Sequence, residues 1–133
     1  MFLYNLSQQQ KEYTLDLFIH AANADEIFEE SEMAVIKQYC DEMKIEMRTD
    51  TQNDLKTTIE KLTELSSASE LKMILIELAA LILSDDEYAE EEKKLMEEYV
   101  RISNISKSVS DRAFELVNNL TGIYRDMNDL INS

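Results

Sequence analysis

Apolar residues recur through most of this chain at the three- and four-residue spacing of amphipathic helices. In the first segment they fall on Tyr13, Leu17 and Phe18, after a Ser7-x-x-Gln10 pair that has the form of a capping box. The same spacing predicts further helices over about 29–42, 55–65, about 70–84, around 95–102 and about 112–131. The helix over about 70–84 is apolar almost all round, which is typical of the centre of a helical bundle.

Short polar segments separate these predicted helices. Residues 48–51 are expected to supply the N-cap of the third helix, and the serine-rich stretch 66–69 that of the fourth. Residues 106–111 are expected to form a loop ending in a cap for the sixth helix. In the second helix, the spacing places Met33, Ile36, Cys40 and Met43 inward. The sixth helix has an apolar face at the following positions: Phe114, Leu116, Val117, Leu120, Ile123, Tyr124, Met127 and Ile131.

The chain repeats itself at an offset of sixty residues. The repeat pairs these residues: Asp25 with Asp85, Phe28 with Tyr88, Glu30 with Glu90, Glu32 with Glu92, Tyr39 with Tyr99, and Ile45 with Ile105. The third and sixth helices align at an offset of sixty-one, which pairs Ile59 with Leu120 and Leu62 with Ile123. Two copies of one helical unit that bury each other's apolar faces explain such a pattern. The sequence therefore predicts a single all-α domain over residues 1–133, a compact bundle of six to seven helices built from two pseudo-symmetric three-helix repeats, about 7–66 and about 69–133.

Composition narrows the function classes. Proline is absent and glycine occurs once, which argues against all-β folds and excludes a glycine-rich phosphate loop. The 28 acidic and 13 basic residues give a net charge of −15, which repels the phosphates of nucleic acids. Basic proteins and divalent cations are the natural counterparts of such a surface.

The sequence also suggests a compartment. Cys40 is the single cysteine, so no intramolecular disulfide forms, and a reducing compartment fits. The N-terminal residues lack the basic stretch and apolar core of a signal peptide. The most apolar run, residues 71–83, is shorter than the roughly 20 residues needed to span a bilayer. We therefore expect a cytoplasmic protein without membrane insertion.

Acidic residues concentrate at the two repeated loop-helix junctions. Eight lie within 23–46 and eight within 84–101. An Asp that opens a loop, with a Glu seven positions later, can offer oxygen ligands to Ca²⁺ or Mg²⁺. The candidate metal ligands are Asp25, Glu32, Asp85, Asp86 and Glu92. In the alternative interpretation, the Glu stabilises the first turn of the helix and the Asp caps the loop, while Phe28 and Tyr88 pack over the following helix. The two roles are compatible, and the complete EF-hand pattern is missing.

These junctions resemble the TerB-like domains, the family of the tellurite-resistance protein TerB, in which the run reads approximately Ala-Asp-Gly-x-Ile-x-x-x-Glu. Here the first copy spans Ala24 to Glu32, and the second spans Ser84 to Glu92. The resemblance implies an all-helical fold, an acidic metal-binding face and a link to bacterial stress response. The family's glycine is replaced by Glu26 and Asp86, and Asp tolerates a left-handed turn better than Glu. Asp85 and Glu92 are therefore the first place to look for an ion.

Other candidate chemistry is sparse. His20 follows Asp16 by one helical turn, a spacing that metal ligands can have, but a half-exposed histidine at a helix end is the simpler interpretation. A di-iron bundle would need Glu-x-x-His pairs, which are absent. A nucleophilic Cys40 would have only His20 as its base. We predict no enzyme. Two functions remain: a cation-binding acidic module of the stress-response type, or a metal-independent module whose acidic face binds a basic protein partner.

Overall fold

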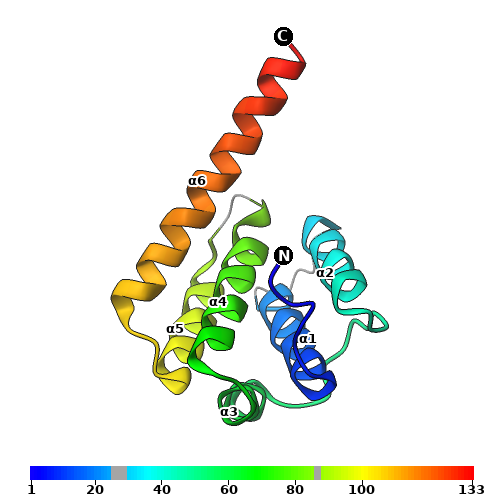
Figure 1. Ribbon diagram of the computed structural model, residues 1–133, viewed down its shortest axis with the longest axis vertical. Coiled ribbons are helices and arrows are strands. Elements are labelled where there is room, and N and C mark those ends of the chain that lie inside the picture. The colour runs from blue at the N-terminus through cyan, green and yellow to red at the C-terminus, as the bar shows by residue number, and fades with distance from the viewer. Residues whose placement is uncertain (25–29, 86–87) are drawn as a thin grey trace.

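The computed structural model describes residues 1–24, 30–85 and 88–133, with only the backbone given for Asp85. Within these ranges the chain forms six α-helices and one short 3-10 helix, and no strand (Figure 1). The elements are α1 Gln8–Ala22, α2 Glu30–Met43, α3 Leu55–Leu65, α4 Ala68–Ile82, η1 Leu83–Asp85, α5 Glu90–Ser103 and α6 Lys107–Ile131. The all-α prediction is confirmed.

Two serine capping boxes begin α1 and α4. The Ser7 hydroxyl accepts a hydrogen bond from the Gln10 backbone amide at 3.2 Å, and the Gln10 side chain accepts one from the Ser7 amide at 2.8 Å. Ser67 and Glu70 form the same pair of bonds, at 3.1 and 2.9 Å. Both predicted caps are confirmed, and each satisfies amides that an uncapped helix would leave without partners.

The helix bounds also follow the offset of sixty. Helix α4 begins and ends sixty residues after α1, and α5 begins and ends sixty residues after α2. After α2 and α5 the backbone turns through Lys44 and Asn104, whose φ angles are 58° and 60°. The Ile45 amide then donates to the Cys40 carbonyl, and the Ile105 amide donates to the Val100 carbonyl, at 3.0 Å in both cases. These are αL helix ends that close two helices of equal length in the same way.

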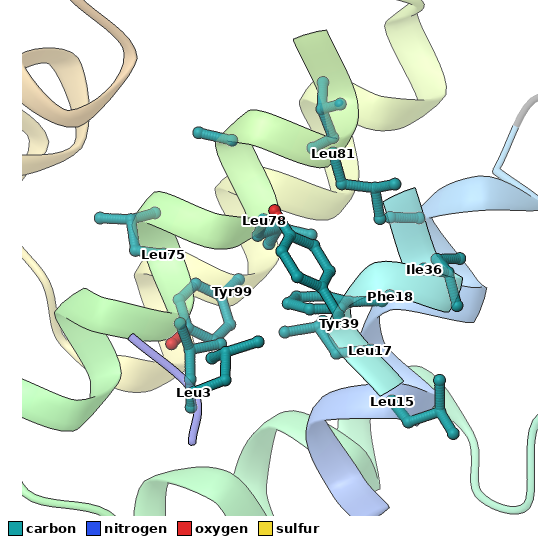
Figure 2. Packing of buried hydrophobic residues seen from close by; sticks show 14 of the residues in the cluster. Leu3, Leu15, Leu17, Phe18, Ile36, Tyr39, Leu75, Leu78, Leu81 and Tyr99 are labelled. Atoms are coloured by element: carbon teal, nitrogen blue, oxygen red, sulfur yellow. The ribbon is translucent and has the colours of Figure 1, made fainter. Parts of the chain in front are cut away.

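The core lies around α4. This helix buries most of its apolar side chains, because α1, α2 and α6 pack against it, and its predicted central place is confirmed. Figure 2 shows Tyr39 of α2 lying beside Phe18 of α1, with Leu78 of α4 next to them; the two rings are 5.0 Å apart. The Tyr39 hydroxyl donates to the Glu77 carbonyl at 2.9 Å, and the Tyr99 hydroxyl donates to the Leu71 carbonyl at 2.7 Å. The two tyrosines thus fasten α2 and α5 to the same central helix.

Two predicted helix starts are wrong. The N-cap of α3 is Asp54, not a residue of 48–51, because its carboxylate accepts the Thr57 amide at 2.7 Å. The N-cap of α6 is Ser106, whose hydroxyl accepts the Val109 amide at 3.3 Å, so the helix begins five residues before Arg112. In α2, Met33 faces solvent with 40% exposure, whereas Ile36, Cys40 and Met43 are buried as predicted.

The third helices of the two halves differ most. α3 has 11 residues and packs against α1 and α5, whereas α6 has 25 residues and packs against α4 with its first turns. Figure 1 shows the rest of α6 extending beyond the other helices to the C-terminal end. Most of the apolar face predicted for the sixth helix is therefore exposed, with Val117 its last buried residue.

Candidate functional site

The structure describes only part of the predicted metal site. Asp25 and Asp86 lie outside the described residues, and so does the side chain of Asp85. The two glutamates, Glu32 and Glu92, are described, and both side chains are only 2% exposed. The sequence thus placed two carboxylates at corresponding positions, in the first turns of α2 and α5, and the fold buries both.

Glu92 has a structural role that its burial explains. Its Oε1 accepts a hydrogen bond from the Ala89 backbone amide at 3.0 Å, which is the carboxylate half of a capping box. Ala89 offers no hydroxyl, so the glutamate alone makes the side-chain contact that begins α5. The capping interpretation is confirmed for Glu92. For Glu32 the corresponding position falls on residue 29, outside the described residues.

Tyr88 contacts α6 as well as α5, the following helix over which it was predicted to pack. Its ring stacks on Phe114 of α6, with 5.2 Å between the centroids and 12° between the planes. The Lys93 ammonium lies 5.4 Å from the centre of the same ring. Burial, and then the charge of Glu92, raises the pKa of Tyr88 to about 12. This residue therefore joins the start of α5 to α6; Phe28, its predicted counterpart, lies outside the described residues.

The described start of each junction lies near the second helix of the other half. A shallow hollow of about 470 Å³ brings the end of α1, at Asn23 and Ala24, next to Glu91 and Glu98 of α5. On the other side, η1 packs against α2. Figure 1 shows α1 and α4 ending toward the same end of the bundle, from which α2 and α5 return. We call the exposed carboxylates Glu30, Glu90 and Glu91, in the first turns of α2 and α5, the acidic junction surface.

The histidine and aspartate of α1 have structural partners. His20 Nε2 lies 2.8 Å from the Asn53 carbonyl oxygen. Asp16 is 1% exposed and accepts hydrogen bonds from Arg48 at 2.5 Å, from the Gln52 amide at 3.0 Å and from the Asn53 side chain at 2.9 Å. Asp16 and His20, whose spacing suggested metal ligands, instead hold the segment between α2 and α3 against α1. Among the described residues, no three His, Cys, Asp or Glu side chains are grouped closely enough to hold a metal ion.

Cys40 is buried, as the sequence predicted. Burial, and then the neighbouring Asp41, raises the pKa of the thiol to about 11. A thiol with so high a pKa carries almost no thiolate near neutral pH, and the thiolate is the nucleophilic form. The environment of Cys40 therefore does not favour nucleophilic catalysis.

A larger hollow of about 800 Å³ lies between α5 and α6. Its floor is apolar and includes Tyr88 and Phe114, and its rim carries three cations that each have an acidic neighbour. The pairs are Lys93 with Glu90 at 3.9 Å, Arg101 with Glu98 at 2.5 Å, and Lys107 with Asp111 at 2.8 Å. This pairing neutralises the rim, so the hollow does not favour one charged substrate class.

Comparisons with family models, with curated proteins and with solved structures give no match for this chain. The TerB-like family thus remains a resemblance carried by the two junction motifs. Within the parts of the chain that the structure describes, no helix combines the length and apolar character needed to cross a membrane.

Proposed function

We propose that this chain is a non-enzymatic helical interaction module with the two-repeat architecture of TerB-like domains. Its acidic junction surface binds a protein partner whose own surface is basic. The observation that carries the proposal is that some of the junction carboxylates are buried and others are exposed. Glu32 and Glu92 are buried within the fold, while Glu30, Glu90 and Glu91 of the same first turns face solvent.

Charge supports this choice of partner. The 28 carboxylates outnumber the 13 basic side chains, so at least fifteen lack a basic side chain to balance them. Lys93 lies 3.9 Å from Glu90, an exposed pair of the kind that contributes little energy. Electrostatic attraction to such a surface accelerates association with a basic protein and weakens as salt rises.

The test is capture of a partner by the immobilised protein, from an extract of its own source cells, with and without chelator. We expect a basic protein that stays bound in chelator and is released by salt. The variant Glu30→Gln/Glu90→Gln/Glu91→Gln should lose it, because three charges leave the acidic junction surface. The control Asp50→Asn/Glu60→Gln/Glu64→Gln removes three exposed charges on and just before α3 and should retain it. Equal binding by both variants, or release by chelator, would contradict the proposal.

Cation binding at the junctions is a second candidate. It is favoured by the burial of Glu32 and Glu92 at corresponding positions, since buried carboxylates are among the groups that metal ions use as ligands. Titration calorimetry with Ca²⁺, Mg²⁺, Mn²⁺ and Zn²⁺ should then show heat for the wild type and less heat for Asp85→Asn/Glu92→Gln, which removes ligands of the second junction only. A circular dichroism spectrum of the variant checks that α5 still forms. Absence of heat, or heat that the substitutions leave unchanged, would remove this candidate.

The stress-response role is proposed from the resemblance alone. Sensitivity to tellurite of cells that lack the protein, with and without a plasmid copy, tests it directly.

A further inference from the structure

The outer half of α6 has an apolar face that no other described residue covers. Past Val117, the helix leaves the bundle (Figure 1). Seven large apolar side chains of α6, all but Leu116 of them past Val117, are between 42% and 76% exposed: Leu116, Leu120, Ile123, Tyr124, Met127, Leu130 and Ile131. A row of this size on a protruding helix marks an interaction surface.

The spacing of the row indicates what covers it. Leu116, Leu120, Ile123, Met127 and Leu130 follow one another at alternating steps of four and three residues. The alternation continues back through Ala113 to Val109, where α6 is still packed on the bundle. Such a repeat, averaging 3.5 residues, keeps one seam of a helix facing a second helix along its whole length. The expected occupant is therefore an α-helix.

The first half of the chain shows how the corresponding side chains are normally used. At the offset of sixty-one, Leu120 and Ile123 correspond to Ile59 and Leu62 of α3. Those two residues are fully buried, because α3 packs against α1 and α5. In α6 the same pair faces solvent. In α3 these apolar side chains are thus buried by the same chain, whereas in α6 a single copy of the chain leaves them exposed.

We infer that the occupant is α6 of a second copy, and that the two helices run antiparallel. Charge favours a second copy at this place. Residues 112–133 contain two arginines and three carboxylates, so they carry only −1 of the net −15. The contact is thus made where repulsion between copies is weakest. In an antiparallel pair with Leu120 opposite Ile123, the two copies of Val117, the last buried residue of α6, lie nine residues or about 14 Å apart along the pair at 1.5 Å per residue. The two bundles, which carry the other −14 each, therefore begin farther apart than the Debye length of about 8 Å.

The flanking positions select the antiparallel direction. Val117, Tyr124 and Ile131 form a second apolar row beside the seam, spaced by seven residues. In an antiparallel pair this row faces its own counterpart, so Tyr124 approaches Val117 of the second copy. In a parallel pair it would face Arg112, Asn119 and Asp126, which would bury polar and charged groups against apolar ones.

The antiparallel register also fits a groove on the bundle. Placing Leu120 opposite Ile123 of the second copy puts Leu116 opposite Met127 and the small Ala113 opposite Leu130. Ala113 lies in a groove of about 390 Å³ between α4 and α6, whose walls include Leu75, Ile76 and Leu116. Leu130, the most exposed residue of the seam, enters this groove from the second copy. The seam and the groove therefore form one continuous, self-complementary interface.

The first test is the mass of the full chain in solution, measured by sedimentation equilibrium over a range of concentrations. We expect twice the monomer mass of 15.5 kDa. Leu120→Glu/Ile123→Glu should weaken self-association by more than about a hundredfold, since it places charges in the seam. Both side chains are exposed, so the helical circular dichroism of the variant should be kept. The control Asn118→Glu/Asn128→Glu adds the same charge off the seam and should remain dimeric.

The second test fixes the direction of the helices. Neither Leu116→Cys nor Met127→Cys is expected to form a disulfide-linked homodimer. The two copies of either residue lie about 16 Å apart along the pair, because eleven residues at 1.5 Å each separate positions 116 and 127. A mixture of the two variants should form crosslinked heterodimers. A monomer at every concentration, a dimer unaffected by Leu120→Glu/Ile123→Glu, or ready crosslinking of Met127→Cys alone would each overturn the inference. A monomer that sediments with lipid vesicles through the same residues would overturn it too.

Discussion

Replacing Arg48 with methionine is expected to lower the free energy of unfolding by about 3 kcal/mol, the lower end of the cost of breaking a buried ion pair. The substitution leaves the Asp16 carboxylate buried without its cation, although the Gln52 amide and the Asn53 side chain still bond to it. It also removes the guanidinium bonds to the Glu12 and Asp50 carbonyls, which hold the segment between α2 and α3 against α1. Urea denaturation monitored by circular dichroism measures the change.

The control for Arg48 is a lysine in an ion pair that is equally direct but exposed. Lys107 lies 2.8 Å from Asp111 on the surface of α6. Lys107→Met should leave the free energy of unfolding nearly unchanged, since water screens such pairs and solvates the partner that remains. The double variant Asp16→Asn/Arg48→Met should recover part of the loss, because no uncompensated charge is left buried. Equal effects of Arg48→Met and Lys107→Met would contradict the structural role assigned to Asp16.

Local sequence signals predicted the helices well, because their causes are local. The capping boxes at Ser7 and Ser67 each act within four residues, and the near-continuous apolar run of α4 already implies burial on all sides. The start of α3 was missed because the stretch 48–51 looks like a polar cap. Arg48, within it, instead bonds to a residue thirty-two positions earlier. The local sequence shows only that Arg48 is one of 13 basic residues in a chain with 28 acidic ones, which does not identify its partner.

The candidate site shows a different limit of the sequence. An Asp followed by a Glu seven positions later is equally compatible with a metal ligand set and with a helix cap. The capping bond of Glu92 to Ala89 shows which role that carboxylate plays in the fold. In α6 the apolar spacing correctly predicted a helix, but spacing alone does not say whether the same chain covers its apolar face. Only the straight course of α6 away from the bundle reveals that Leu120 and Ile123 are exposed.

Two buried tyrosines should make the fold sensitive to alkali. Burial raises the pKa of Tyr39, with Glu77 and Glu42 adding to the effect, and burial alone raises that of Tyr99. In the unfolded chain a tyrosine ionises near pH 10. Above that pH the unfolded state gives up protons that the folded state keeps, so the stability contributed by these tyrosines is fully present below pH 10. It is lost as the pH rises from there toward the folded pKa values.

The free energy of unfolding is therefore expected to fall by up to roughly 2.7 kcal/mol per pH unit between about pH 10 and 12, at 1.4 kcal/mol for each tyrosine. Tyr39→Phe/Tyr99→Phe should remove this part of the slope. It should leave the smaller part that comes from Tyr88 and Cys40, because burial also raises their pKa values, to about 12 and about 11. It should also cost about 1–3 kcal/mol at neutral pH, because the Glu77 and Leu71 carbonyls lose their hydroxyl donors. Tyr4→Phe, at an exposed position, leaves both buried hydroxyls in place and should keep the slope. Urea titrations at several pH values measure all three chains; an equally steep loss in the double variant would show that other groups drive alkaline unfolding.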